Sequence, residues 1–356
     1  MQSVANLVKE LHENVQYFIV CQDVDLNGAV LEGIETDKWV PYNAHTQVLY
    51  SSPGKISDTI VKQVEKLKPD ILFIIGLFSW HFNMVPMLFC KGPKKILSTR
   101  GMLHPGALSQ KKWKKYIYLQ LFKLLEYHYS VHFHATDADE KNFILKYFGE
   151  PAKVSIAGNF PNKLAPLAVA EKKAGSLRLV SIAIVSPMKN ILLVIQALEK
   201  CKADVSYDIF GPVKDEDYWD LCTEKIKALP GNIRVTYHKE IAPSQVRDAL
   251  APAHVFILPS KSENFGHAIF EALSAARPVI TSMNTPWKAL KEAGAGMNVT
   301  IADEGELATA INRFAEMDES ELSQWSEAAC LYAEKMVDLE KVRGEYAEMF
   351  GVVEVY

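Results

Sequence analysis

The chain has 356 residues, of which 49% are hydrophobic, and a net charge of −4 at pH 7. This length exceeds what one ordinary core organises, so we expect two domains, and the mildly negative charge disfavours a general nucleic-acid binder. The five cysteines follow no paired spacing, which indicates buried thiols in a reducing compartment and neither a disulfide framework nor a metal site. No apolar run approaches the roughly 18 residues of a membrane span and no signal peptide opens the sequence, so we expect a cytoplasmic protein.

The first half of the chain alternates helix-like and strand-like patterns, beginning with a helix pattern over residues 1–11. Such alternation predicts a parallel, doubly wound α/β sheet. We expect strands at residues 17–21, 47–50, 71–75, 95–98, 131–135 and 154–157, and helices at 57–67, 107–127 and 139–148.

Residues 162–176 mix Pro, Ala, Lys and Gly without periodicity and are interpreted as an interdomain linker. A second alternating series follows, with strands expected at 179–184, 205–209, 233–237, 255–258, 279–282 and 297–299, and helices at 191–200, 217–229, 243–250, 267–276 and 286–292. We therefore predict two Rossmann-like domains, 1–165 and 166–335, with a helix over 336–356 packing back on the first.

Three classes of protein share such a pattern: GT-B enzymes, in which the two domains face each other across a cleft, periplasmic-type binding proteins and two-domain dehydrogenases. A dehydrogenase is disfavoured because no strand here is followed by Gly-x-Gly-x-x-Gly. A periplasmic-type binding protein is disfavoured because it would carry a secretion signal, and none opens this sequence. The motifs must decide.

The most informative stretch covers residues 258–287. An apolar strand pattern ends at Pro259, and an apolar-striped helix pattern begins at His267. The N-terminus of such a helix offers backbone N–H groups and the positive end of its dipole to an anion, and Gly266 lets a ligand approach the backbone closely. The loop therefore predicts a phosphate site.

Two carboxylates bracket this site, Glu263 in the loop and Glu271 about one turn inside the helix. Carboxylates repel phosphate, so they are better suited to accept hydrogen bonds from hydroxyl groups. A ligand with phosphates in the middle and hydroxyls at both ends is a nucleotide-sugar.

Glu263 and Glu271, set around Phe265-Gly266 and followed by Arg277-Pro278-Val279, resemble the donor motif of retaining glycosyltransferases of family 4. The longer string ENFGHAIFEAL, with Thr285-Pro286-Trp287 downstream, resembles a bacterial branch of that family that serves capsule and lipopolysaccharide synthesis. The resemblance implies the GT-B fold, which is the fold class that we predict.

The resemblance also implies roles for single residues. Lys189, in the loop after the first strand of the second domain, would hold the donor diphosphate, and Glu271 and Glu263 would hold the ribose and sugar hydroxyls. Front-face attack, with the leaving phosphate taking the acceptor proton, needs neither a protein nucleophile nor a metal. The implied donor-binding residues are Ser186, Lys189, Asn190, Glu263, Asn264, Phe265, Gly266, His267 and Glu271.

The sequence departs from the family pattern in three places. Ile184 stands where relatives carry an arginine five residues before the lysine, and Met283 stands where many carry aspartate. Losing one charge-assisted bond to a phosphate costs about 1.5–3 kcal/mol of binding. Family members also begin with a strand and a Gly-Gly loop before the first helix, so we expect that the full protein has a preceding strand, without which two neighbouring strands would lie unpaired.

The first domain offers acceptor-side candidates. Arg100-Gly101 matches the position of a histidine-glycine pair beside the transferred sugar in many relatives, so Arg100 joins Lys189 and Glu263 as a predicted catalytic residue. His104 follows in the same loop, with an idle loop histidine as the alternative. Asn159 matches a turn at the floor of the cleft, with a simple asparagine turn as the alternative.

A basic and aromatic segment begins the helix predicted over 107–127. Lys111, Lys112, Trp113, Lys114 and Lys115 suit an anionic membrane surface, and a solvated lysine face on a core helix is the alternative. We favour peripheral membrane contact, because acceptors in the family are often lipid-linked.

Asp137-Ala138-Asp139 and Asp215-Glu216-Asp217 imitate the Asp-x-Asp metal motif of another glycosyltransferase class. Each lies where a helix is expected to begin, so helix capping explains them. We predict that no metal or other cofactor is required.

The sequence thus predicts a retaining glycosyltransferase that moves a sugar from a nucleotide-diphosphate sugar to a growing, in some cases lipid-linked, glycan. Ile184, Met283 and the expected missing strand favour an alternative, a GT-B protein that binds a nucleotide or glycan without transfer. A sugar-nucleotide epimerase of the same fold is a third interpretation.

Overall fold

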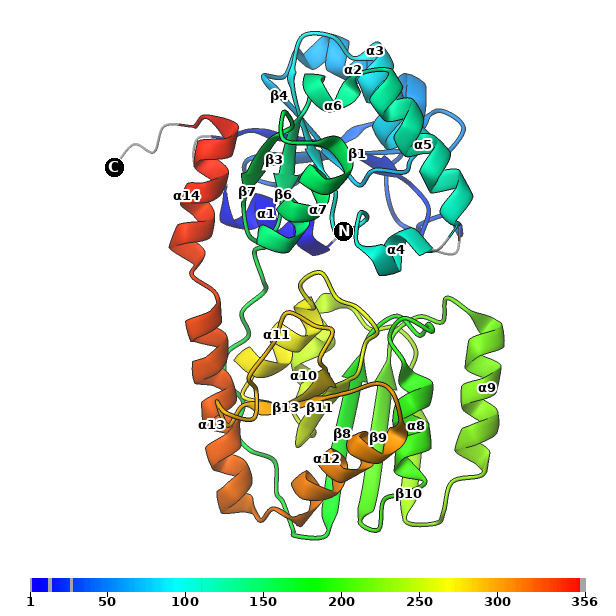
Figure 1. Ribbon diagram of the computed structural model, residues 1–356, viewed down its shortest axis with the longest axis vertical. Helices are drawn as coiled ribbons and strands as arrows, with labels where there is room; N and C mark the ends of the chain where they lie inside the picture. Colours follow the sequence, from blue (N-terminus) through cyan, green and yellow to red (C-terminus); the bar gives the residue numbers. More distant parts are fainter. Residues whose placement is uncertain (1, 12–14, 26–27, 110, 353–356) are drawn as a thin grey trace. The chain divides into compact units, whose positions relative to one another are not determined.

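The computed structural model describes residues 2–11, 15–25, 28–109 and 111–352. The chain divides into two compact units (Figure 1). Unit 1 contains Met1–Phe160 and Leu339–Tyr356, and unit 2 contains Pro161–Asp338. Each unit combines helices with parallel β-structure.

Unit 2 is built on one six-stranded parallel sheet in the order β10-β9-β8-β11-β12-β13. The strands are β8 (Ser176–Ile182), β9 (Asp204–Phe210), β10 (Ile233–Tyr237), β11 (Val255–Leu258), β12 (Val279–Ser282) and β13 (Gly296–Val299). All side chains of β11 and β12 are buried, as expected for apolar strands covered on both faces. The strand order reverses between β8 and β11, and ligands of doubly wound sheets bind beyond the carboxyl ends of strands at such a reversal.

The helices of unit 2 are α8 (Ile191–Leu198), α9 (Glu216–Lys227), η2 (Pro243–Gln245), α10 (Val246–Leu250), α11 (His267–Ser274), α12 (Glu304–Glu316) and α13 (Glu319–Met336). α8 packs against α9 and α12, and α11 packs against α13 (Figure 1). The helix predicted over 286–292 is wrong, because irregular backbone and a turn lead from β12 toward β13 there.

The segment interpreted as a linker is bound along unit 2. Leu164 N donates to Ser274 Oγ at 3.1 Å, and Leu167 N donates to Ala275 O at 3.2 Å. Leu164, Leu167 and Val169 pack against the main apolar cluster of unit 2. Its irregular composition therefore reflects an extended strap that pairs with the end of α11, and not a detached connection.

Arg277 fastens this strap to the rest of unit 2. The side chain is 1% exposed, and burial lowers the pKa of the guanidinium to about 10. The guanidinium donates hydrogen bonds to the backbone carbonyls of Leu167, Ala168, Leu250, Ala251 and Ala276. One side chain thus satisfies carbonyls from the strap, from the end of α10 and from the end of α11.

Replacing Arg277 by lysine is expected to lower the free energy of unfolding by about 3 kcal/mol, because a single ammonium group leaves several of these buried carbonyls without donors. Urea unfolding followed by circular dichroism measures the change. Arg247→Lys, on the exposed side of α10, is the matched control and is expected to change stability by less than about 0.5 kcal/mol. Equal stability of Arg277→Lys and Arg247→Lys would contradict the anchoring role.

Unit 1 contains two sheets, one in the order β1-β3-β2 and a parallel one in the order β4-β5-β6-β7. The strands are β1 (Tyr17–Gln22), β2 (Trp39–Asn43), β3 (Thr46–Ser51), β4 (Ile71–Ile75), β5 (Lys94–Ser98), β6 (His132–Ala135) and β7 (Lys153–Ile156). β1 and β4 end their respective sheets, yet Ile19 shares an apolar cluster with Ile71, and Val20 shares another with Leu72. The strands of unit 1 therefore form two separate sheets, and β1 and β4 are edge strands whose side chains share these apolar clusters.

The helices of unit 1 are α1 (Gln2–Glu10), α2 (Ile56–Leu67), η1 (Trp80–Met84), α3 (Val85–Phe89), α4 (Pro105–Ser109), α5 (Lys112–Leu124), α6 (Tyr127–Ser130), α7 (Ala138–Phe148) and α14 (Leu339–Phe350). The single helix predicted over 107–127 is wrong in extent. Lys111 (φ 52°) and Glu126 (φ 56°) adopt left-handed backbone at the two ends of α5, which interrupts the helix. α14 packs into unit 1 through Val342, Tyr346 and Met349.

Candidate active site

The two loops at the strand-order reversal of unit 2 are joined to each other. Lys261 N, in the loop after β11, donates to Met188 O in the loop after β8 at 2.8 Å. Asn190 Nδ2 donates to Pro259 O at 3.3 Å, with Asn190 at φ 60° immediately before α8. Parallel strands end at one edge of a sheet, and the structure brings these two loops into direct contact there.

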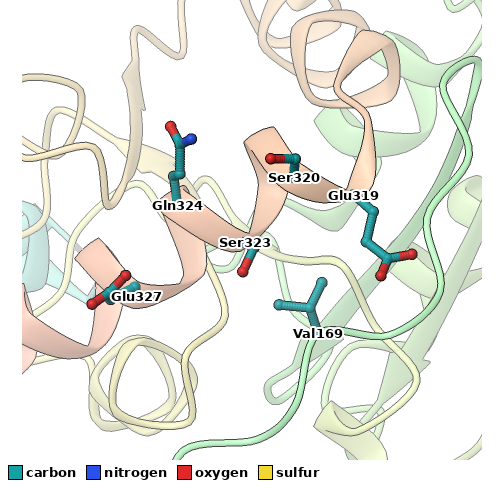
Figure 2. Close-up of a pocket in the computed structure, with 6 residues that line it drawn as sticks. All are labelled: Val169, Glu319, Ser320, Ser323, Gln324 and Glu327. Carbon is teal, nitrogen blue, oxygen red and sulfur yellow. The ribbon is translucent and has the colours of Figure 1, made fainter.

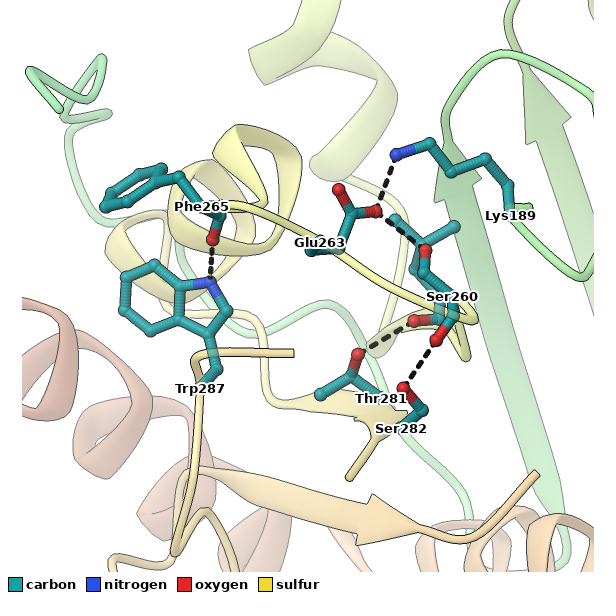
Figure 3. Close-up of polar contacts among 8 residues, drawn as sticks. Lys189, Ser260, Glu263, Phe265, Thr281, Ser282 and Trp287 are labelled. Atoms are coloured by element: carbon teal, nitrogen blue, oxygen red, sulfur yellow. Dashed lines mark hydrogen bonds and ion pairs between the residues drawn. The ribbon is translucent and has the colours of Figure 1, made fainter. Parts of the chain in front are cut away.

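Lys189 and Glu263 form an ion pair at this junction (Figure 3). Lys189 Nζ lies 2.5 Å from Glu263 Oε1, and Ser260 Oγ donates to the same oxygen at 2.7 Å. The side chains of Lys189 and Glu263 are 24% and 10% exposed, so water screens the pair only in part. Two predicted catalytic residues are therefore in contact, and Ser260 is a participant that sequence analysis missed.

Hydroxyl groups of β12 hold the backbone of this loop in place (Figure 3). Thr281 Oγ1 donates to Leu258 O at 2.8 Å, and Ser282 Oγ donates to Ser260 O at 2.5 Å. Both hydroxyl residues are fully buried. The position of Ser260, and with it the carboxylate of Glu263, is thus fixed by the neighbouring strand.

Gly266 immediately precedes α11 and has a left-handed backbone conformation, φ 79°. A Cβ at this position would lie 3.1 Å from Ile269 Cδ1 and 3.2 Å from Trp287 Nε1, so a larger residue is opposed by both conformation and space. Trp287 Nε1 donates to Phe265 O at 2.6 Å, and the two rings meet edge to face (Figure 3). The helix begins at His267 as predicted. Its first backbone N–H groups directly follow this turn, which the hydrogen bond from Trp287 holds in place.

Glu271 lies one turn inside α11 and is 8% exposed. Burial raises the pKa of its carboxyl to about 7, although a hydrogen bond from Asn162 Nδ2 to Oε1 at 3.3 Å acts in the opposite direction. Glu271 is therefore divided between its protonated and ionised forms near neutral pH. Asn162, which sequence analysis assigned to the linker, is part of the site.

The remaining donor-loop residues lie in the same two loops. Ser186 O accepts the backbone N–H of Lys189 at 3.0 Å, which forms the turn that ends at Asn190. Ser186, Ile184 and Asn264 are all half-buried. Ile184 contributes no positive charge to the site. Besides Lys189, these two loops contain one further cation, the exposed Lys261, which sequence analysis also missed.

The acceptor-side candidates of unit 1 are partly brought together. Arg100 follows β5 with a left-handed backbone, φ 48°, and its Nη1 donates to the side chain of Asn159 at 2.6 Å. Arg100 Nε and Nη2 are buried and have no hydrogen-bond partner among the described residues. The same guanidinium interacts with the buried phenol of Tyr346 on α14, where its positive charge acts against the burial that raises the pKa of that phenol.

Glu140, which sequence analysis missed, holds the turn at Arg100 in place through hydrogen bonds from the neighbouring residues Thr99 and Gly101. The carboxylate is buried and accepts from Thr99 Oγ1 at 2.6 Å, Gly101 N at 2.5 Å and Thr136 N at 2.7 Å. Glu140 lies in the first turn of α7 beside Asp139, where acidic residues are common, so no distinct signal in the sequence pointed to its role. His104 is exposed, accepts from Gly106 N at 3.2 Å and meets Phe143 edge to face. His104 thus contacts its own loop and α7.

The acidic triplets cap helices, as predicted. Asp137 accepts from Glu140 N at 2.7 Å at the start of α7, and Asp215 accepts from Tyr218 N at 3.0 Å at the start of α9. Within the described part of the chain, no group of three or more His, Cys, Asp or Glu side chains is arranged to hold a metal ion.

A hollow of about 530 Å³ lies elsewhere on unit 2, between the strap and α13 (Figure 2). Its lining residues are Val169, Glu319, Ser320, Ser323, Gln324 and Glu327. Lys172, which precedes β8, donates to Ala315 O and Met317 O just before α13, so α13 begins at the amino edge of the sheet. The residues that line this hollow include two carboxylates and no cation, so the hollow does not suit a phosphate ligand.

Residues 167–330 match the family model for glycosyl transferases group 1. The match covers β8 to β13 and both loops of the candidate donor site, and it confirms the prediction of an enzyme of the glycosyltransferase class. No curated protein sequence gives a match to the chain.

Solved structures with similar folds cover nearly the whole chain. Anabaena HepE in complex with UDP-glucose has a TM-score of 0.70 at 15% identity, over 96% of this chain and 100% of that one. Sucrose-phosphate synthase from Thermosynechococcus elongatus has a TM-score of 0.73 at 15% identity, over 98% and 91%. WaaG, described as a glycosyltransferase involved in lipopolysaccharide biosynthesis, has a TM-score of 0.63 at 13% identity, over 88% and 89%. These likenesses confirm the predicted GT-B fold with two Rossmann-like domains.

Proposed function

We propose that this protein is a retaining glycosyltransferase of family 4, which moves a sugar from a nucleotide-diphosphate sugar to a growing glycan in bacterial surface polysaccharide synthesis. The observation that carries the proposal is the Lys189–Glu263 ion pair, which lies at the strand-order reversal of a glycosyltransferase group 1 domain. Additional support comes from similar folds: HepE was solved with UDP-glucose, and WaaG is described as serving lipopolysaccharide biosynthesis.

Donor binding would exchange one partner of the ion pair for another. The diphosphate, with its two or more negative charges, competes with Glu263 for Lys189 Nζ. The carboxylate released in this way accepts hydrogen bonds from the sugar hydroxyls, and ionised Glu271 accepts from the ribose. The same charges therefore keep the site ordered before the donor arrives and hold the donor afterwards.

Catalysis would depend on stabilising the leaving diphosphate, because negative charge develops there as the glycosidic bond to phosphate breaks. Lys189 and the N-terminal backbone groups of α11 supply positive charge at that point. The acceptor attacks from the face that the phosphate leaves, so the anomeric configuration is retained, and the leaving phosphate takes the acceptor proton. We propose no required metal.

Arg100 would act on the acceptor side. Its positive charge would attract a phosphate or carboxylate group, while Asn159 holds Nη1. A lipid-linked acceptor, which carries phosphate beside its first sugar, would present such a group. The proposal accordingly includes peripheral contact of unit 1 with an anionic membrane.

A thermal-shift screen against UDP, GDP, ADP and their sugar conjugates, followed by turnover assays, tests the proposed function. We expect one nucleotide series to raise Tm by several degrees and the matching sugar-nucleotide to support transfer. Nuclear magnetic resonance of the product should show the anomeric configuration of the donor. Nucleotide binding without transfer to any acceptor would favour the non-catalytic interpretation, and isomerised donor in the absence of acceptor would identify an epimerase.

A further inference from the structure

α5 has an apolar inner face that belongs to the core of unit 1. Leu119 and Phe122 are buried and join the apolar cluster around β5 and β6. This face anchors the helix in the fold. A helix with no further role would present polar residues on its opposite face.

The outer face of α5 is also apolar. Trp113 and Leu124, at its two ends, are each 77% exposed. At 3.6 residues per turn, positions 113, 116, 117, 121 and 124 form one continuous stripe. The exposed side chains in this stripe are Trp113, Tyr116, Ile117, Leu121 and Leu124. An exposed apolar stripe of this length marks an interaction surface.

Lysines border the stripe on both sides. Relative to Trp113, helical geometry places Lys112 and Lys123 about 100° to one side and Lys114 about 100° to the other. Lys115 instead turns inward, where its Nζ donates to Ala107 O at 2.5 Å and lies 5.3 Å from the centre of the Phe78 ring. Residues 107–125 contain five lysines and no acidic residue.

This charge pattern decides between possible partners of the surface. A second copy of the chain, docked face to face, would place its lysines against these lysines, which is unfavourable. An anionic lipid surface complements both features, since acyl chains accept the apolar stripe and headgroup phosphates accept the lysines on either side.

We propose that α5 lies in the headgroup layer of an anionic membrane, with the apolar stripe from Trp113 to Leu124 inserted and Lys112, Lys114 and Lys123 against lipid phosphates. This surface deepens the proposed function, on which its biological role rests, because it would bring unit 1 to lipid-linked acceptors. It also revises the membrane segment predicted from the sequence, since Lys115 is directed into the fold and the inserted side chains extend far beyond Trp113.

Sedimentation of the full-length protein with vesicles tests the proposal. Vesicles of 30% phosphatidylglycerol in phosphatidylcholine are expected to bind the protein, and pure phosphatidylcholine vesicles to bind it at least about tenfold more weakly. Trp113→Ser/Ile117→Ser/Leu124→Ser should reduce the partition coefficient at least about tenfold. Lys112→Gln/Lys114→Gln/Lys123→Gln should reduce it about 100-fold and remove most of its salt dependence, since each lysine near the surface contributes roughly fivefold.

Leu221→Ser/Leu331→Ser is the matched control, because both leucines are exposed on helices of unit 2. Circular dichroism establishes that each variant is folded. Equal vesicle binding by the wild type and both α5 variants would overturn the proposal. Absence of vesicle binding together with a dimer that the serine variant dissolves would assign the stripe to a second copy instead. Because this assay needs neither donor nor acceptor, its result is separate from that of the transfer assay.

Discussion

Replacing Lys189 by alanine is expected to lower kcat/KM for sugar transfer by about 100- to 1,000-fold, which is typical of losing a group that stabilises charge in the transition state. Lys189 is the cation that the structure holds against Glu263 at the edge of the donor loop, with 2.5 Å between Nζ and Oε1. The substitution removes the charge opposite the leaving diphosphate and leaves a carboxylate there that repels it. Both kcat and donor affinity should therefore fall. Steady-state kinetics over a range of donor concentrations separates the two effects.

Two further lysines serve as controls for this variant. Lys261→Ala removes the exposed cation of the neighbouring loop and is expected to cost less than Lys189→Ala, about tenfold at most in kcat/KM. Lys200→Ala, which removes a surface ion pair to Glu304, should leave kcat/KM unchanged. If Lys189→Ala retained activity within threefold of the wild type, the assignment of this residue to the diphosphate would be wrong.

Donor affinity is expected to increase as pH rises from 6 to 8, and Glu271→Gln should abolish that increase. Burial raises the pKa of Glu271 to about 7, so the carboxylate that accepts hydrogen bonds from ribose is the minor form below this pH and the major form above it. The glutamine variant keeps one acceptor oxygen but never ionises, and its donor affinity should be about tenfold or more below that of the wild type at pH 8. Isothermal titration calorimetry with UDP or GDP at several pH values measures this dependence.

The same substitution should stabilise the protein in the absence of donor. Because the pKa of Glu271 is raised from 4.5 to about 7 in the folded chain, ionisation favours the unfolded state. The resulting loss of stability is absent below pH 4.5 and complete above pH 7, where it reaches about 3 kcal/mol at most. Glu271→Gln is therefore expected to raise the free energy of unfolding at pH 8 and to change it little at pH 5. Glu327→Gln, on the exposed side of α13, is the control; identical behaviour of the two variants would contradict the buried-carboxyl interpretation.

The sequence by itself determined most of unit 2, because its information there is local. A short apolar run such as Val255–Leu258, ended by Pro259, indicates a buried strand, and the loop that follows predicts a helix start at His267. Parallel strands end at one edge of a sheet, so the alternation of strands and helices placed the loops of Lys189 and Glu263 at the same edge, although it did not predict their ion pair. Asp137 and Asp215 were also predictable as caps, since a cap is defined by its next few residues.

Only the tertiary structure decided contacts between residues that are distant in the chain. Asn162 reaches Glu271 because the strap lies along unit 2, and the composition of the strap contains no sign of that path. The meeting of Arg100 with Asn159 likewise depends on how separate strands of unit 1 are arranged.

Local sequence patterns were also insufficient to predict which face of α5 is buried. Periodicity identifies a helix with apolar residues on several sides, but it does not tell which side the core covers. That choice is made by burial of Leu119 and Phe122, which leaves Trp113 and Leu124 outside and turns Lys115 inward. Local pattern thus specified the elements and their ends, whereas packing, through the free energy of burying particular faces, specified their partners.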